Sequence, residues 1–151
     1  MKKFLGIALV SLALAAGGSQ ASAQSCSDDD LDALQCGGDS LGTIVDGCLQ
    51  SQECVIYLLM GDTPGLVECT AQCFADTFPT VTTGCVGCFR DLAECGLEAA
   101  VSTGNEDCAA CATGLCSPSC LSCVEESGCR ADFDACTGGT IADYCEAPTC
   151  G

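Results

Sequence analysis

Eighteen cysteines in 151 residues constrain this chain more than any other feature of its sequence. An even number of cysteines at this density is typical of small proteins that pair them in an oxidising compartment outside the cytosol. Each such bond stabilises a fold by about 2–4 kcal/mol, mainly because it restricts the unfolded chain. We therefore predict that all of them form structural disulfides, with the pairing left open: Cys26, Cys36, Cys48, Cys54, Cys69, Cys73, Cys85, Cys88, Cys95, Cys108, Cys111, Cys116, Cys120, Cys123, Cys129, Cys136, Cys145 and Cys150.

The N-terminus has the pattern of a secretory signal peptide. Lys2-Lys3 precedes an apolar run over residues 5–16, and Ala21-Ser22-Ala23 forms an A-x-A cleavage site. The apolar run is too short to cross a bilayer as a helix. The sequence predicts a signal peptide at residues 1–23, one cysteine-rich domain without a membrane span at residues 24–151, and secretion to the periplasm or the exterior.

The charge balance restricts the partners. The chain has 21 acidic and four basic residues, for a formal net charge of −17. Cleavage after residue 23 would leave only Arg90 and Arg130 as cations and move the charge to −19. A basic patch for nucleic acid cannot form from two arginines. The acidic surface favours cations or basic proteins as partners, or it keeps a secreted protein dispersed.

Helix signals dominate the rest of the chain. Ser27 is an N-cap residue followed by acids in the first turn, and Asp62-Thr63-Pro64 and Ser117-Pro118 are typical helix starts. The fold class predicted is all-α, with small disulfide-rich helical hairpins and long irregular loops. We predict helices over residues 27–36, 40–60, 62–76 and 85–95, a shorter piece over 108–116, helices from 117 and over 130–136, and a coil after 139.

The cysteine spacing predicts how the helices are joined. Cysteines three or four residues apart, such as Cys69 and Cys73, lie one turn apart on the same side of a helix. They are poor partners for each other but can bridge a matching pair on an antiparallel helix, which gives two parallel disulfide rungs. A weak internal repeat, residues 85–104 and 120–139, aligns the segments 88–95 and 129–136 and points to duplicated hairpins.

Four of the cysteines also match a metal-site spacing. Cys85-x2-Cys88 and Cys108-x2-Cys111 fit a four-cysteine zinc site. The signal peptide and the fourteen other cysteines favour disulfides, so we predict no metal ligand and no cofactor. Metal binding by cysteine thiolates or by the acidic surface stays open as an alternative.

The acidic cluster at residues 28–39 gives a second metal hypothesis. Asp28, Asp30 and Asp32, with Asp39 at loop position twelve, have the spacing of a calcium-binding loop. Such a loop needs glycine at position six, where this chain has Ala33. Acids in the first turn of a helix explain the cluster better.

No residue pattern predicts catalysis. The chain has no histidine, which excludes hydrolytic triads that depend on one. A reactive cysteine needs a cation or a helix N-terminus nearby, and the mature chain offers few such places. We predict no catalytic residue and a protein that is not an enzyme.

The C-terminal half resembles a group of proteins. Its end, Cys129-x3-Phe133-x2-Cys136-Thr137-Gly138, follows several C-x2-C pairs from Cys85 onward. This run resembles uncharacterised cysteine-rich secreted bacterial proteins with a C-x3-F-x2-C-[ST]-G motif. The resemblance implies secretion and disulfide pairing, and it implies no activity.

These inferences combine into one functional prediction. We predict a secreted, acidic, disulfide-rich and non-enzymatic structural or interaction protein, with an extracellular protein or cations as its partner and with self-association left open. The first alternative is the metal-binding protein described above. The second is a secreted effector or inhibitor that presents residues 77–84 or 98–107 as an exposed loop.

Overall fold

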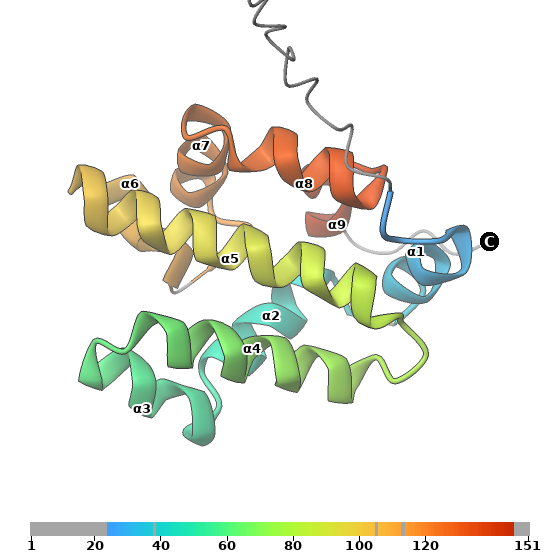
Figure 1. Ribbon diagram of the computed structural model, residues 1–151, viewed down its shortest axis with the longest axis horizontal. Coiled ribbons are helices and arrows are strands. Elements are labelled where there is room, and N and C mark those ends of the chain that lie inside the picture. Colours follow the sequence, from blue (N-terminus) through green and yellow to red (C-terminus); the bar gives the residue numbers. More distant parts are fainter. Residues whose placement is uncertain (1–23, 38, 105, 113, 147–151) are drawn as a thin grey trace, which may run out of the picture.

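A computed structural model describes residues 24–37, 39–104, 106–112 and 114–146 (Figure 1). Across these ranges the regular structure is entirely helical, which confirms the predicted all-α, disulfide-rich fold. The predicted signal peptide lies outside the described residues. None of the helices described combines the length and apolar character that crossing a membrane requires. The helices are α1 (Asp28–Gln35), α2 (Leu41–Leu49), α3 (Gln52–Met60), α4 (Thr63–Thr77), α5 (Thr83–Thr103), α6 (Glu106–Ala109), the 3₁₀-helix η1 (Ala110–Ala112), α7 (Pro118–Glu126), α8 (Cys129–Thr137) and α9 (Ile141–Cys145).

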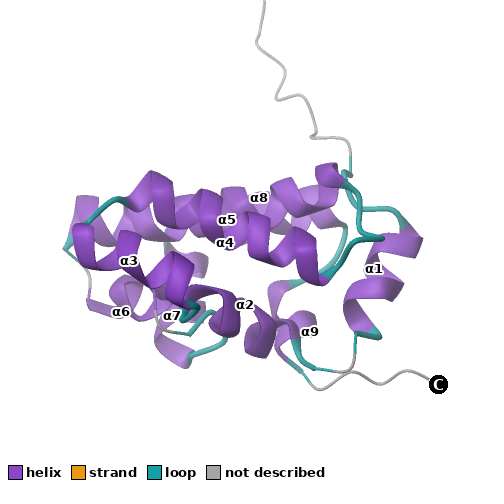
Figure 2. Cartoon of the chain, turned by 90° about the horizontal axis from the view of Figure 1, so that it is seen from below, coloured by secondary structure: helices purple, strands orange, loops and turns teal. Residues whose placement is uncertain are grey.

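The 21-residue helix α5 is the centre of the molecule. It packs between α4 on one side and α8 on the other, and these three helices form a layer (Figure 1). Figure 2 shows α2, α9, α6 and α7 covering one face of this layer, with α1 at one end. The opposite face of α4 and α5 therefore has no helical cover among the described residues.

An aromatic cluster fills the space between the two layers. Phe74 of α4 and Phe89 of α5 have ring centroids 4.8 Å apart, and Phe89 lies 4.9 Å from Phe133 of α8. Tyr144 of α9 closes the cluster at 6.0 Å from Phe89. All four side chains are buried. Tilted and edge-on pairs of this kind add to the stabilisation that burial alone provides.

Sixteen of the cysteines predicted to form disulfides pair in eight bonds, and these bonds join nearly every helix to another. Cys36 is also disulfide-bonded, and Cys150 lies outside the described residues. The eight bonds are Cys26–Cys85, Cys48–Cys73, Cys54–Cys69, Cys88–Cys136, Cys95–Cys129, Cys108–Cys123, Cys111–Cys120 and Cys116–Cys145.

The prediction of paired rungs between closely spaced cysteines is confirmed at one place, and a second, wider ladder joins the repeated segments. The C-x2-C pair at 108 and 111 bridges the C-x2-C pair at 120 and 123, in antiparallel order. The segments 88–95 and 129–136, which align in the predicted repeat, are joined to each other by two rungs between α5 and α8. The prediction is wrong for the pair 85 and 88, which bind the N-terminal segment and α8 respectively. It is also wrong for Cys69 and Cys73, which bind two different helices, α3 and α2.

The predicted helix over residues 40–60 is two helices. α2 ends before Gln50, and α3 begins after Ser51, whose side chain accepts a hydrogen bond from the Cys54 amide at 3.3 Å. Gly42 and Gly47 have weak helix propensity, but both lie inside α2 and neither causes the break. The break lets Cys48 and Cys54 reach two different turns of α4 from separate helices.

The break leads to the first prediction. Replacement of Ser51 by alanine is expected to lower the free energy of unfolding by about 1 kcal/mol, because the N-terminus of α3 loses its side-chain cap. Guanidinium unfolding of the oxidised protein measures this change. The control is Ser122→Ala in the exposed interior of α7, which should change stability by less than half as much. Equal effects of the two substitutions would contradict the capping role of Ser51.

The predicted end of the long helix at Gly96 is also wrong. α5 continues to Thr103 and ends at Gly104, which has a left-handed φ of 63° that favours glycine. Gly96 lies against Cys111 and Val124, so packing on η1 and α7 offsets the weak helix propensity of glycine. The longest connection that the structure describes in full covers residues 78–82, which is shorter than the long loops predicted. Part of the predicted C-terminal coil is helix α9.

Candidate interaction surface

The cysteines with zinc-site spacing do not form a site together. Cys85 is bonded to the N-terminal segment, Cys88 to α8, and Cys108 and Cys111 to α7. A sulfur atom in a disulfide is not a thiolate and cannot serve as a thiolate ligand. The structure therefore overturns the four-cysteine zinc alternative.

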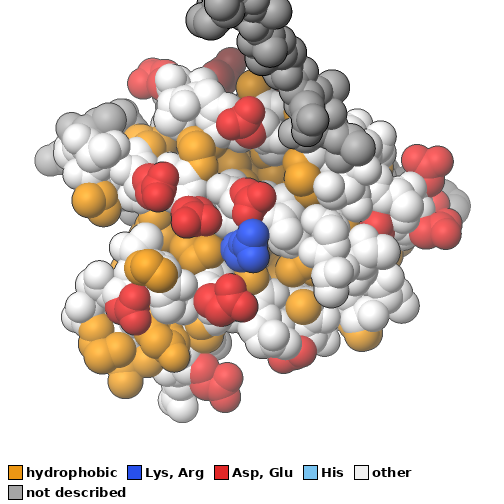
Figure 3. Space-filling model, in the orientation of Figure 1, with side chains coloured by type: hydrophobic (Ala, Val, Ile, Leu, Met, Phe, Trp, Pro, Cys, Tyr) orange, Lys and Arg blue, Asp and Glu red, His pale blue; other side chains and the backbone are white. Residues whose placement is uncertain are grey.

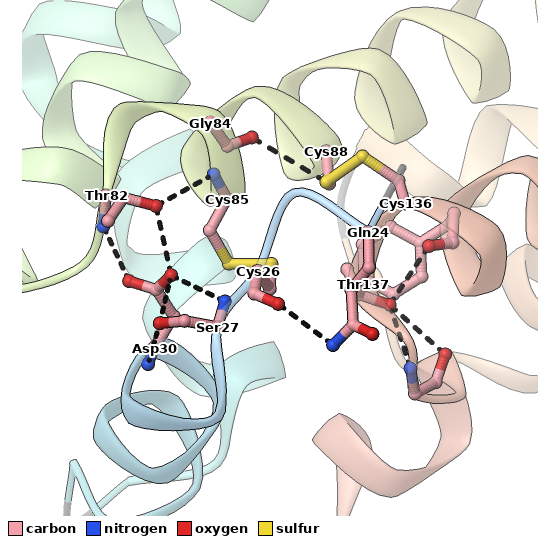
Figure 4. The surroundings of a disulfide bond; sticks show 12 residues. Gln24, Cys26, Ser27, Asp30, Thr82, Gly84, Cys85, Cys88, Cys136 and Thr137 are labelled. Carbon is pink, nitrogen blue, oxygen red and sulfur yellow. Dashed lines mark hydrogen bonds between the residues drawn. A yellow bond between two sulfur atoms is a disulfide. The ribbon is translucent and has the colours of Figure 1, made fainter. Parts of the chain in front are cut away.

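The acidic cluster at residues 28–39 is the start of a helix. Ser27 and Asp30 form a capping box, in which each side chain accepts a hydrogen bond from the other's backbone amide. Asp30 is 2% exposed and also accepts bonds from the Thr82 amide at 2.7 Å and the Thr82 hydroxyl at 3.0 Å (Figure 4). Asp30 thus fastens α1 to the start of α5, next to the disulfide Cys26–Cys85. This arrangement supports the helix-start interpretation over the calcium loop.

Of the two segments considered as effector loops, one is largely helix and the other is a short loop that is only partly exposed. Residues 98–103 belong to α5. In the other segment, Phe78 and Val81 are buried, and Thr82 caps α5 and binds Asp30. Pro79, Thr80 and Thr82 of this short loop are exposed, so the loop remains accessible between α4 and α5.

One helix carries large apolar side chains toward solvent. Ile56, Leu59 and Met60 of α3 are 51%, 81% and 62% exposed, and their spacing places them on one face of the helix. Leu58 is exposed as well. Figure 3 shows this cluster at the lower left of the molecule. We call these four residues the α3 apolar surface. Contiguous exposed apolar side chains on a small protein mark interaction sites.

A groove lies on the same side of the molecule, between α4 and α5 (Figure 3). Its volume is about 450 Å³. Apolar and polar side chains line both walls. The residues that line it are Thr63, Pro64 and Val67 of α4, and Glu94, Leu97, Glu98, Val101 and Ser102 of α5.

Negative charge dominates the edge of this groove. Glu94 and Glu98 are exposed, and none of the described lining residues is basic. The nearest cation along α5 is Arg90, which binds the Asp91 carboxylate at 3.0 Å. The pKa of Arg90 is raised by its hydrogen bond to Asp91 and by the charges of Asp91, Glu68 and Glu94. Because acidic side chains surround Arg90, its positive charge is neutralised locally. The electrostatic potential over the groove therefore stays negative.

A second hollow, of about 670 Å³, lies between α3 and α4. Carboxylates of Glu53, Glu68 and Asp76 line it above the disulfide Cys54–Cys69. In the part of the chain that the structure describes, no three histidine, cysteine or acidic side chains lie close enough together to hold a metal ion. The three carboxylates of this hollow therefore do not form a metal site. The hollow gives the metal-binding alternative no specific support.

Two other ionisable groups have shifted pKa values for structural reasons. Burial raises the pKa of Asp134, against the opposing charge of Arg130. Burial also raises the pKa of Tyr144, which packs in the aromatic cluster. Both lie where α8 meets α9, and both shifts follow from packing.

The α3 apolar surface is not among the features predicted from the sequence. The run from Val55 to Met60 supplies apolar positions of the helix predicted over residues 40–60, and this prediction does not say which of them are exposed. The available signal was that six apolar residues in a row cover every face of a helix, whereas a helix on the surface of a small domain buries only one stripe.

Comparison of the chain with protein-family models, with characterised proteins and with solved structures finds no match. The resemblance of the C-terminal half to cysteine-rich secreted bacterial proteins stays a prediction. What the fold defines is a small, all-helical protein stabilised by extensive disulfides.

Proposed function

We propose that this protein is a secreted, non-enzymatic interaction protein that binds a partner protein through the α3 apolar surface. The observation that carries the proposal is the exposure of Ile56, Leu59 and Met60 on one helix face. The helix beneath them is held by the Cys54–Cys69 bond, so the surface is formed before binding and little flexibility is lost on association.

Three further observations support the proposal. Eight disulfides require an oxidising compartment, which agrees with the signal peptide predicted at the N-terminus. The absence of histidine from the sequence removes the commonest general base. The two arginines of the predicted mature chain are ion-paired on helices, so the folded protein offers poor sites to trypsin-like proteases of the exterior.

The second prediction tests this function. The oxidised full chain is immobilised and exposed to the proteins secreted by the cell that makes it. We expect the wild type to retain one protein in stoichiometric amount and the Leu59→Ser variant to retain at least tenfold less, because the apolar contact is lost. Leu59 is 81% exposed, so the substitution should leave the melting temperature unchanged.

The control is Gln52→Ser, an exposed position in the first turn of the same helix. This variant is expected to retain as much partner as the wild type. The proposal fails if the wild type retains no more of any protein than Leu59→Ser does.

A further inference from the structure

The groove between α4 and α5 has the geometry of a helix-binding site. Its α5 wall consists of residues 94, 97, 98, 101 and 102, which follow the i, i+3, i+4, i+7, i+8 pattern of one continuous helix face. Its α4 wall is the first turns of α4, and the described residues place no other helix over this face (Figure 1). A groove between two packed helices matches the ridge that side chains form along a third.

Disulfides hold both walls of the groove in place. α4 is bonded to α3 through Cys54–Cys69, and α5 is bonded to α8 through Cys95–Cys129, beside Glu94. The groove is consequently present before a ligand arrives, and binding does not have to order it.

The apolar side chains on both walls of the groove favour an amphipathic helix as its occupant. Leu97 and Val101 lie one turn apart on α5 and face Pro64 and Val67 across the groove. An amphipathic helix places apolar side chains at the same interval and inserts them into such a groove. The described residues contain no strand, so they offer no edge to an extended peptide.

The negative charges at the edge of the groove favour an occupant that carries positive charge. Glu94 and Glu98 are one turn apart, an arrangement in which like charges destabilise a helix. Lysine or arginine from a partner would relieve this repulsion. A second copy of this chain would instead bring together two molecules of net charge −17.

We propose that the groove between α4 and α5 binds a helix of a partner protein whose apolar face is flanked by lysine or arginine. This proposal rests on the proposed function as an interaction protein and specifies the chemistry of the partner. The α3 apolar surface lies beside the groove on the same side of the molecule and provides a second contact for the same partner (Figure 3).

The third prediction tests this pairing with synthetic peptides. Calorimetric titration of the oxidised full chain uses an amphipathic helix of leucine and lysine, and a matched helix in which glutamate replaces lysine. We expect the lysine peptide to bind at least tenfold more tightly than the glutamate peptide. Rising salt should weaken its binding, because exposed charges are screened.

Two variants and a control locate the binding. Glu94→Gln/Glu98→Gln removes both charges and should weaken binding of the lysine peptide about tenfold. Val101→Ser should weaken it several-fold, and its 78% exposure keeps the substitution from affecting the fold. The control is Glu126→Gln/Asp132→Asn, which removes two exposed charges from α7 and α8 and should weaken binding less than threefold.

The outcomes separate this inference from the function on which it rests. Equal affinity for the two peptides, or equal effects of the glutamate pair and its control, would show the inference to be wrong. If in that case the retention of a secreted partner still depends on Leu59, the protein is an interaction protein that uses the α3 apolar surface without the groove.

Discussion

A variant without the two disulfides between α5 and α8 is expected to be unfolded at room temperature. The Cys95–Cys129 bond joins residues 34 apart in the sequence, and a loop of this length corresponds to about 4 kcal/mol. With that bond closed, Cys88–Cys136 restrains only the short segments between the two rungs, which corresponds to about 3 kcal/mol. Their sum, about 7 kcal/mol, is comparable with the whole stability of a small domain, about 5–15 kcal/mol.

Circular dichroism during guanidinium and thermal unfolding, without reductant, measures this fourth prediction. The variant with alanine at all four positions should show no cooperative transition, whereas Cys88→Ala/Cys136→Ala alone should stay folded and lose about 3 kcal/mol. The control is Cys111→Ala/Cys120→Ala: with Cys108–Cys123 closed, this bond restrains only the short segments between the two rungs and should contribute about 2 kcal/mol. A melting temperature of the four-alanine variant close to that of the wild type would refute the role assigned to these rungs.

The cysteine spacing made the helical ladder predictable from sequence. Two C-x2-C pairs on consecutive short helices have few ways to pair, and the antiparallel order 108–123 and 111–120 satisfies both at once. Helix starts at Asp62 and Ser117 were equally predictable, because their signals are local: an N-cap side chain followed by proline in the first turn.

What could not be predicted depends on partners distant in the sequence. α5 passes through Gly96 because Cys111 and Val124 pack against it, and no local pattern reveals those neighbours. The pairing of Cys26 with Cys85 spans 59 residues and follows from the docking of α1 on the start of α5. Spacing alone assigned Cys85 to the same ladder as Cys88.

The candidate surface was hidden for a related reason. The apolar character of Val55 to Met60 predicts a helix, but which of these side chains are buried depends on the element that covers them. In the structure α3 turns Cys54 and Tyr57 toward α4 and leaves Ile56, Leu59 and Met60 uncovered. The composition of the run predicts that it forms a helix. Which face of that helix stays exposed to solvent depends on the position of α4.

Asp30 is the residue at which local and distant contacts meet. Its acidic character was predicted to begin a helix, and it does so by capping α1 with Ser27. In its second role, Asp30 accepts hydrogen bonds from both the amide and the hydroxyl of Thr82, and these bonds join residues 52 apart in the sequence. A buried carboxylate that satisfies donors on two elements holds their relative orientation, because its removal leaves those donors without partners.

The fifth prediction follows from this position. Asp30→Ala is expected to lower the free energy of unfolding by about 3 kcal/mol, since it removes a helix cap and two charge-assisted hydrogen bonds to Thr82. Asp29→Ala, on the exposed neighbour in the same first turn, is the control and should cost less than 1 kcal/mol. Guanidinium unfolding at neutral pH distinguishes the two, and similar losses would show that Asp30 acts only as one more acid in the first turn.

The contribution of Asp30 should also depend on pH in a defined direction. Burial raises the pKa of Asp30, but the hydrogen bonds from Ser27 and Thr82 outweigh burial and hold it below its ordinary value of 3.8. A carboxyl whose pKa is lower in the folded state than in the unfolded state stabilises the fold fully above the unfolded value, and this stabilisation is lost as the pH falls through the folded value. The stability difference between the wild type and Asp30→Asn should accordingly stay constant from pH 7 to about pH 5 and shrink below about pH 4. A difference that keeps its full size down to pH 2 would mean that the carboxylate is not the group holding α1 to the start of α5.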